Sequence, residues 1–183
     1  DCKNLFCIAL VNSKSRIEKN GWVKSAKLKY ILPSKLKITI IEEKPYFLLK
    51  KNNKFTLLNI NGKEIEVLDS FESSYDNLIV LSGNGVEKKV EHLIKILKVS
   101  NEITSKITSA NLISNRRWSL IYNSTVTIEL PEENSIQALY KISQLEEKYN
   151  LLSNKLKKID LRISDRMIIE LNTKTNYAKE NNI

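Results

Sequence analysis

The stretch KIDLRISDRMIIEL, residues Lys158 to Leu171, decides the fold, because it reads as two short strands joined by a turn. Beyond it the chain has too few large apolar side chains to offset the entropy cost of ordering, so residues 173–183 are predicted to be a disordered tail. The run MIIEL at 167–171 is therefore predicted to be the last strand of a sheet, with no later segment to cover it. An uncovered strand presents unpaired backbone groups to which another chain can add a strand. The sequence thus indicates a protein that binds other proteins.

The chain has 183 residues, of which 42% are hydrophobic and 28% are charged. This composition is typical of a folded protein with one sizeable core or two small ones. The longest apolar run, Leu5 to Val11, is much shorter than the ~20 residues that cross a bilayer as a helix. The chain opens at Asp1 without a methionine or a signal sequence, and we expect further chain upstream.

The net charge of +9 is concentrated at the N-terminal end, where residues 1–44 carry +6 and residues 45–183 carry +3. An anionic lipid surface, an acidic partner or a nucleic acid would each explain such a basic segment. The lysines are spread singly along amphipathic strands, without interleaved aromatics or an RNA-binding motif. This pattern favours a solvated face over a nucleic-acid surface.

The first 44 residues predict a short helix. It is expected over residues 12–20, with Asn12 or Ser13 as its N-cap and Gly21 in a left-handed turn at its C-terminal end.

A β-hairpin is expected to follow this helix. Over residues 22–42 apolar and polar side chains alternate on both sides of the turn Leu32–Pro33–Ser34. Pro45 has no amide hydrogen and is expected to end the second strand. We therefore place a boundary there, between one domain at 1–44 and another at 45–172.

The second domain is predicted to be rich in β-structure, with helices indicated by apolar residues at i, i+3 and i+4. Turns are expected at Asn52–Asn53 and Asn61–Gly62. The expected strands are 46–50, 55–60, 65–67, 107–113, 118–122 and 125–130, the expected helices are 86–99 and 134–148, and the hairpin 159–171 closes the domain. The fold class is therefore α+β, with two helices packed on one face of a larger mixed β-sheet.

Catalytic and metal-binding patterns are absent from the sequence. His92, the only histidine, falls opposite the apolar stripe of its helix and is interpreted as a solvated surface residue. Cys2 and Cys7 have no second Cys/His pair to complete a zinc site, which leaves free thiols or a local disulfide. The glycine-rich loop 82–85 lacks the ending of a phosphate-binding loop. We therefore expect no enzyme activity, no cofactor, no metal and no small-molecule substrate.

Four motifs in a fixed order resemble the extracytoplasmic region of the bacterial FtsQ/DivIB cell-division family. They are GWVKSAKLKYILPSKLKITIIEEKP at 21–45, LLNINGKEI at 57–65, RRWSLIYNSTVTIEL at 116–130 and IDLRISDRMIIEL at 159–171. Each motif is weak alone, and the order and spacing of the four carry the resemblance. It covers nearly the whole chain.

The resemblance implies a bitopic protein on the periplasmic side of the inner membrane at the division septum, with a single-pass anchor upstream of Asp1. Residues 1–44 would then be a POTRA domain that lacks its first strand and helix, followed by the larger β domain. Members of the family are scaffolds that join early and late division proteins. They bind FtsB, and FtsL with it, when a segment of FtsB adds a strand to the last β-strand.

The same resemblance implies which residues bind the partner. Where better-studied members have a tyrosine and a tryptophan, this chain has Ile163 and Leu171, so aliphatic burial replaces aromatic anchoring. The alternative for all of these residues is ordinary sheet packing with solvated arginines. The expected partner-binding residues are Arg116, Arg117, Arg162, Ile163, Asp165, Arg166, Met167, Ile168, Ile169 and Leu171.

Two other functions remain alternatives. A POTRA-type module for outer-membrane assembly also works by strand addition, but it is expected in arrays, and the sequence has no internal repeat. A basic nucleic-acid-binding domain would show steeply salt-dependent binding to unrelated DNA. We expect neither nucleic acid nor a small molecule as partner, and we expect the basic residues 1–44 to lie near an anionic membrane surface.

Overall fold

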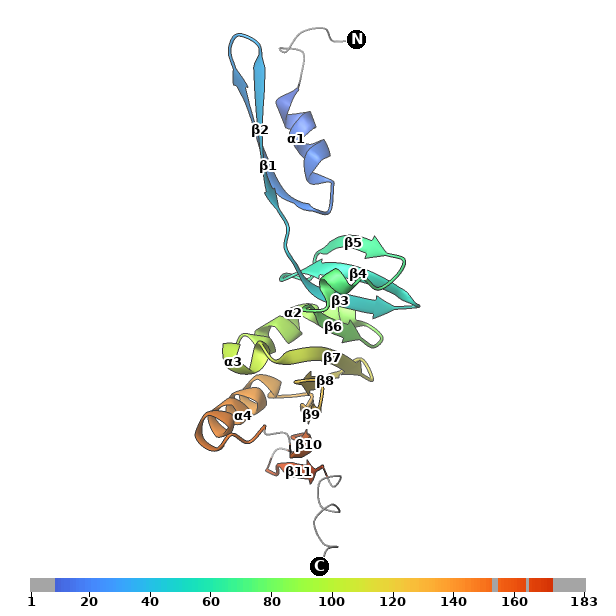
Figure 1. Ribbon diagram of the computed structural model, residues 1–183, viewed down its shortest axis with the longest axis vertical. Helices are drawn as coiled ribbons and strands as arrows, with labels where there is room; N and C mark the ends of the chain where they lie inside the picture. The colour runs from blue at the N-terminus through green and yellow to red at the C-terminus, as the bar shows by residue number, and fades with distance from the viewer. Residues whose placement is uncertain (1–8, 153–154, 164, 173–183) are drawn as a thin grey trace, which may run out of the picture.

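The computed structural model describes residues 9–152, 155–163 and 165–172, and these form two separate β-sheets (Figure 1). The elements in chain order are α1 (Leu10–Glu18), β1 (Val23–Ile31), β2 (Lys35–Glu42), β3 (Pro45–Lys51), β4 (Lys54–Asn59), β5 (Glu64–Leu68), the 3₁₀ turn η2 (Ser73–Tyr75), β6 (Ile79–Ser82), α2 (Val86–Leu97), α3 (Asn101–Thr104), β7 (Ile107–Ile113), β8 (Arg117–Tyr122), β9 (Val126–Glu129), α4 (Ser135–Tyr149), β10 (Leu156–Asp160) and β11 (Ile168–Leu171). The α+β class predicted from the sequence is confirmed. The predicted disordered tail, 173–183, and both cysteines lie outside the described residues.

Helix α1 begins at Leu10, two residues before the predicted start. Its N-cap is Ala9, and no side chain caps the helix, so the prediction of Asn12 or Ser13 as the cap is wrong. The reason is that the Ser13 N–H already donates to the Ala9 carbonyl at 2.9 Å, which places both predicted caps inside the first turn.

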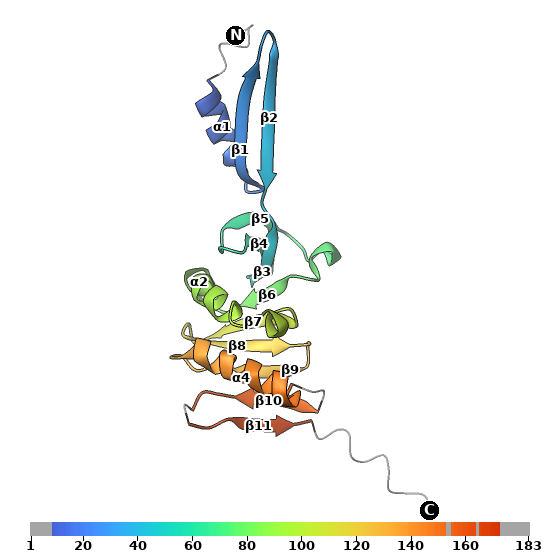
Figure 2. The ribbon, with the colours of Figure 1, turned by 90° about the vertical axis from the view of Figure 1, so that its left-hand side faces the viewer.

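The first sheet is the antiparallel hairpin of β1 and β2, as predicted, with Leu32–Pro33–Ser34 as its turn. Leu28 is opposite Ile38 and Tyr30 is opposite Leu36, so apolar residues of both strands share one face. Helix α1 lies beside β1, and the hairpin extends away from the rest of the molecule (Figures 1 and 2).

Gly21 joins α1 to the hairpin, but its role differs from the predicted one. It does not have a left-handed backbone; instead, a Cβ at this position would lie 1.9 Å from the carbonyl oxygen of Ile65 in β5. Glycine is therefore required by a close approach of two backbones. The sequence does not reveal this contact, because the two residues are far apart in the chain.

The two sheets meet where β2 ends and β3 begins. Pro45 is the first residue of β3 and does not end the preceding strand as predicted; a strand's first position tolerates a residue without an amide hydrogen. Glu43 is buried at the junction and accepts a hydrogen bond from Asn59 Nδ2 at 3.0 Å. The side chain of Trp22 packs against a small apolar cluster of Leu48, Leu57, Ile65 and Leu68.

The second sheet has nine strands in the order β11-β10-β9-β8-β7-β6-β3-β4-β5. The turns predicted from asparagine and glycine are confirmed, since Asn52, Asn53 and Gly62 have φ values of 50°, 60° and 79°. Strand β6 was not predicted, and neither were α3 and η2. Strand β6 pairs in parallel with β3 and with β7, and β10 pairs in parallel with β9, so the sheet is mixed.

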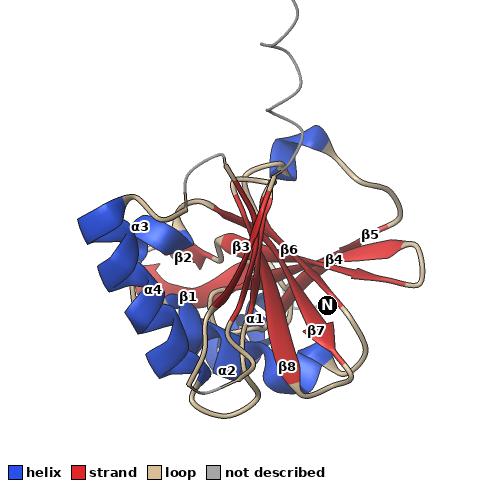
Figure 3. Ribbon diagram, turned by 90° about the horizontal axis from the view of Figure 1, so that it is seen from below, coloured by secondary structure: helices blue, strands red, loops and turns tan. Residues whose placement is uncertain are grey.

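Helices α2 and α4 lie on the same side of the nine-stranded sheet, as predicted (Figure 3). They close the main core, in which Leu93 of α2, Leu139 of α4 and Trp118 of β8 are fully buried. The first and last strands in the sheet order, β11 and β5, are its two edges. The predicted terminal hairpin is also confirmed, because β11 pairs antiparallel with β10.

Candidate partner-binding site

Strand β11 is an open edge that carries large aliphatic side chains. Ile168, Ile169 and Leu171 are 52%, 43% and 60% exposed. Exposed aliphatic side chains on an unpaired edge strand favour pairing with another chain. By contrast Ile159, which is opposite Ile169 on β10, is fully buried. The face of the sheet that packs against the core therefore extends as far as β11, where the Ile169 side chain is partly exposed.

The register indicates which backbone groups of β11 face outward. The Asn172 N–H donates to the carbonyl of Lys155 at 2.8 Å, so it points toward β10. Because N–H directions alternate along a strand, those of Glu170 and Ile168 point inward, and those of Ile169 and Leu171 point to the open edge. These two residues can pair with an added strand through both N–H and C=O groups.

A groove of about 590 Å³ opens beside the beginning of β11. Its walls come from the loop before α4, the first half of α4 and the segment between β10 and β11. The charged residues on these walls are Glu132, Glu133, Lys141, Arg162 and Arg166, and the apolar ones include Ala138, Leu161, Ile163 and Met167. Arg166 and Met167, which line the groove, directly precede β11, so the groove lies at the start of the open edge strand.

Arg162 is held by an ion pair with Asp160. Its Nε lies 2.8 and 2.9 Å from the two carboxylate oxygens, and its Nη2 lies 2.5 Å from Oδ2. The hydrogen bonds from Arg162 hold the pKa of Asp160 below its ordinary value, against a smaller opposing effect of burial. The guanidinium is therefore positioned on the groove wall and partly neutralised there.

Arg116 reaches the same groove through Glu132, since its Nη1 lies 3.1 Å from Glu132 Oε2. Arg117 behaves differently: it is half-buried, and its Nε has no hydrogen-bond partner among the described residues. Arg166 is exposed and has no ion-pair partner in the described part of the chain. Of the predicted arginines, Arg166 is thus the cation most available to an incoming carboxylate.

The structure brings most of the predicted residues together. Ile163, Arg166 and Met167 line the groove, and Asp165 is exposed in the loop between them. The sequence reasoning missed the contribution of α4, where Gln137 and Lys141 lie on the groove wall. Their spacing of four residues predicts that they share one face of the helix. It does not predict that this face lines the groove beside the segment between β10 and β11.

His92 is half-buried, so its interpretation as a solvated residue is wrong. Its Nε2 lies 3.3 Å from the hydroxyl oxygen of Ser135, at the start of α4, and burial lowers its pKa. No group of three or more His, Cys, Asp or Glu that could hold a metal occurs in residues 9–152, 155–163 and 165–172. Within the same ranges, no helix is long and apolar enough to span a membrane.

Comparison with known proteins identifies two matching family profiles. "Cell division protein FtsQ/DivIB, C-terminal" matches residues 47–162, and "POTRA domain, FtsQ-type" matches residues 3–43. The first covers the nine-stranded sheet up to Arg162, and the second covers α1 and the hairpin.

Proteins named cell division protein FtsQ are similar over most of the chain. The one from Novosphingobium aromaticivorans is 30% identical over 152 residues, which is 82% of this chain and 47% of that protein. Those from Cereibacter sphaeroides and Rickettsia bellii are 28% and 27% identical, each over 91% of this chain and over 54% and 61% of their own lengths. This chain thus spans about half the length of these relatives.

A solved structure, the major extracytoplasmic domain of the trans isomer of the bacterial cell division protein DivIB from Geobacillus stearothermophilus, is also similar. It covers 62% of this chain and 98% of its own, with 11% identity and a TM-score of 0.43. Since the FtsQ/DivIB profile spans more than half of the sequence, the chain belongs to the FtsQ/DivIB family of cell-division proteins.

Proposed function

We propose that this protein is a non-enzymatic division scaffold, which binds an FtsB-like partner, and FtsL with it, by adding a strand of the partner to β11. One observation carries the proposal: the edge strand β11 has three exposed aliphatic side chains and no covering segment among the described residues. The family membership supports a role in division. Such a scaffold works by binding alone and needs no cofactor.

In this proposal the partner strand pairs with the outward N–H and C=O groups of Ile169 and Leu171. Its side chains cover the aliphatic row and continue the core face beyond Ile159. The partner segment that leads into the strand crosses the groove, where Ile163 and Met167 offer apolar contact and Arg166 attracts a carboxylate. Arg162 and Arg116 act mainly by shaping the groove through their ion pairs.

We further propose that residues 1–44 and 45–172 are two modules on the periplasmic side of the inner membrane at the septum. An anchor upstream of Asp1 would hold the protein there. The basic first module would then face the anionic membrane surface, and β11 would lie at the end of the molecule away from it (Figure 1).

The test is calorimetric titration with the extracytoplasmic segment of the FtsB-like protein from the same organism. Ile169→Pro removes one outward N–H, and we expect it to abolish binding without unfolding the protein, as checked by circular dichroism. Ile169→Val keeps the N–H and should bind nearly as well as the wild type. Unchanged affinity of folded Ile169→Pro would contradict the proposal.

The opposite edge of the sheet offers a matched control. Val67 in β5 is 55% exposed on the other edge strand. Ile169→Lys and Val67→Lys each add one positive charge to an edge strand. Only Ile169→Lys should weaken partner binding, by about tenfold or more, because it removes an apolar contact and buries a charge in the interface. Equal losses from both would indicate binding at any open edge.

A further inference from the structure

The β1–β2 hairpin carries an unusual concentration of positive charge on one face. Residues that are opposite each other in an antiparallel pair project to the same side, and Lys29 is opposite Lys37 while Ile31 is opposite Lys35. Lys27, opposite Thr39, shares that side. We call Lys27, Lys29, Lys35 and Lys37 the lysine face; all four are exposed.

Within residues 9–152, 155–163 and 165–172, no acidic side chain forms an ion pair with this face. The segment from Lys19 to Ile41 has six lysines and no carboxylate. Like charges directly opposite each other destabilise a strand pair, so an anion over Lys29 and Lys37 would relieve this repulsion.

The end of the hairpin is apolar. Leu32 is 69% exposed and Ile31 is 43% exposed, and Pro33 follows them in the turn. We call Ile31 and Leu32 the hairpin tip. Lys35 is level with Ile31, and the pair Lys29–Lys37 lies two residues, about 7 Å, further back along the strands at 3.3 Å per residue. The order along the hairpin is thus Leu32 at the end, one lysine beside Ile31, and the other three lysines behind it.

We propose that the hairpin docks on an anionic lipid bilayer, with the hairpin tip at the boundary between head groups and acyl chains and the lysine face against the phosphates. The proposal rests on the membrane-facing orientation proposed above for residues 1–44 and is independent of β11. Interfacial segments bury their apolar side chains about 5–10 Å deep, which matches the distance from Ile31 back to the pair Lys29–Lys37. Lysine side chains reach from that depth to the phosphates.

Other anionic partners fit the hairpin less well. Single-stranded nucleic acid is held by aromatic side chains on which bases stack, and the lysine face has none, since Tyr30 projects to the opposite side with Leu36. Neither double-stranded DNA nor a soluble acidic peptide requires an exposed aliphatic tip in front of the lysines. A bilayer is the partner whose own layers, acyl chains below phosphates, match that order.

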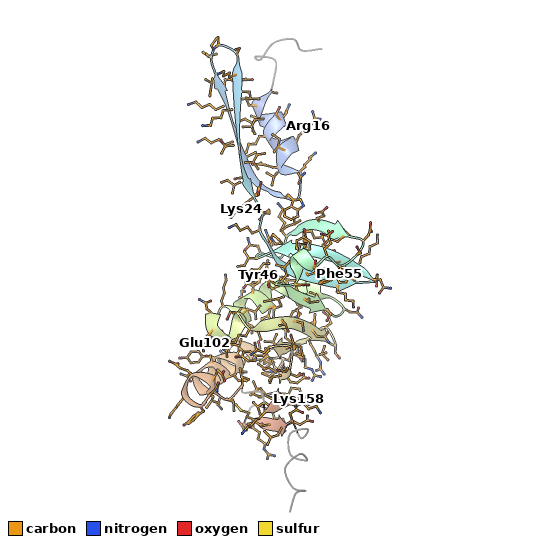
Figure 4. All side chains as sticks on the ribbon, viewed as in Figure 1. Arg16, Lys24, Tyr46, Phe55, Glu102 and Lys158 are labelled. Carbon is orange, nitrogen blue, oxygen red and sulfur yellow. The ribbon has the colours of Figure 1, made fainter. Side chains whose placement is uncertain are left out.

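The location of the hairpin agrees with this partner. It forms one end of the elongated molecule, and β11 forms the other (Figures 1 and 2). In the view of all side chains, Arg16 lies on α1 beside the hairpin and Lys158 lies near the opposite end of the molecule (Figure 4). A protein docked through the hairpin tip would therefore hold β11 far from the lipid surface and open to a partner.

The experiment is co-sedimentation of the whole chain with phosphatidylcholine vesicles that either contain or lack phosphatidylglycerol. A variant with Lys27, Lys29, Lys35 and Lys37 all changed to Gln should lose about tenfold or more of its partition coefficient for the anionic vesicles, since each lysine near such a surface contributes about 1 kcal/mol. A matched variant with exposed Lys50, Lys88, Lys95 and Lys98 changed to Gln has the same net charge. It should stay within about twofold of the wild type. Equal losses in the two variants would overturn the proposal, because net charge alone would then explain binding.

The tip is tested separately with Leu32→Ser, which changes no charge and, at an exposed position, should leave the fold intact. We expect it to lower the partition coefficient several-fold, because each buried CH₂ contributes about 0.8 kcal/mol to insertion, and to leave the salt dependence unchanged. Two results together would contradict the bilayer proposal: Leu32→Ser binds vesicles like the wild type, and the lysine variant loses DNA binding to the same extent as vesicle binding. They would show that the lysine face recognises polyanions in general.

Failure of this proposal can be told apart from failure of the scaffold function. The lysine variant should bind the FtsB-like segment as the wild type does, and Ile169→Pro should bind vesicles as the wild type does. Loss of both vesicle binding and segment binding in either variant would show that the two ends of the molecule are coupled, and would contradict two independent binding sites.

Discussion

The indole Nε1 of Trp22 donates a hydrogen bond to Glu66 Oε2 at 2.8 Å, and this contact joins the hairpin directly to the nine-stranded sheet. Beside it, Gly21 touches the backbone of Ile65. The buried carboxylate of Glu43 closes the same junction by accepting from Asn59. Three contacts therefore hold the two sheets together at one point.

Gly21→Ala should loosen this junction. The added Cβ would overlap the carbonyl oxygen of Ile65, and the backbone would have to move, at a cost of about 1–3 kcal/mol in the free energy of unfolding. Glu66→Ala removes the exposed acceptor of the Trp22 hydrogen bond and leaves the indole in place, so it should cost about 1 kcal/mol or less. Urea denaturation of both variants checks the order, and a smaller loss for Gly21→Ala than for Glu66→Ala would contradict the overlap.

Glu43→Ala should destabilise the protein more than Lys63→Ala. Removing the carboxylate leaves the Asn59 amide without its acceptor in a buried site, which costs about 1–3 kcal/mol. Lys63 is half exposed and lies 3.4 Å from Glu43, so its loss should cost under about 1 kcal/mol. Thermal unfolding of the two variants at neutral pH makes the comparison, and equal losses would indicate that the ion pair dominates.

The Asp160–Arg162 pair should make stability depend on acid. Hydrogen bonds from Arg162 lower the pKa of Asp160 in the folded protein, so the stabilisation is complete above the ordinary value of 3.8 and is lost as the pH falls through the lowered pKa. The expected loss is about 1 kcal/mol, because the partly exposed arginine is screened by solvent. Asp160→Asn should remove this part of the acid dependence in denaturation measured from pH 5 downward.

Ile159 and Ile169 are cross-strand partners whose truncation should cost very different amounts of stability. Ile159→Ala leaves a cavity in the core and should cost about 2–5 kcal/mol of stability. Ile169→Ala removes a side chain that is half exposed, and it should cost far less in the free protein. Urea denaturation of each variant, without and then with the FtsB-like segment, would reveal whether the segment makes Ile169 behave as a core residue.

Arg166→Glu should slow association with an acidic partner segment more than Arg162→Gln does. Arg166 is exposed and outside any ion pair among the described residues, whereas Arg162 is already neutralised by Asp160. Charges at the rim of an interface act mainly on the association rate and on its salt dependence. Surface plasmon resonance at several salt concentrations measures both, and an identical salt slope for Arg166→Glu and the wild type would contradict this role.

The sequence alone predicted most of the local structure, with β6, α3, η2 and the cap of α1 as exceptions. Alternating residues predicted the hairpin of β1 and β2, the apolar stripes predicted α2 and α4, and the asparagine turns predicted the meander of β3 to β5. The apolar run at 167–171 predicted the last strand, and β11 (Ile168–Leu171) lies at an edge of the sheet. These features depend on residues that are close together in the chain, so the periodicity and the turn residues of one short segment are enough to predict them.

Tertiary structure decided everything that joins distant segments. Strand β6 pairs in parallel with β3 and β7. In the chain, β4, β5 and η2 separate it from β3, and α2 and α3 separate it from β7. The groove exists because α4 lies beside the β10–β11 loop, and this is why Lys141 could not be predicted as part of the site. The sequence around Gly21 predicts a turn residue, because its close approach to the backbone of Ile65 depends on a segment far away in the chain. Contacts of this kind depend on how the layers pack, and packing is a property of the whole chain rather than of any one stretch.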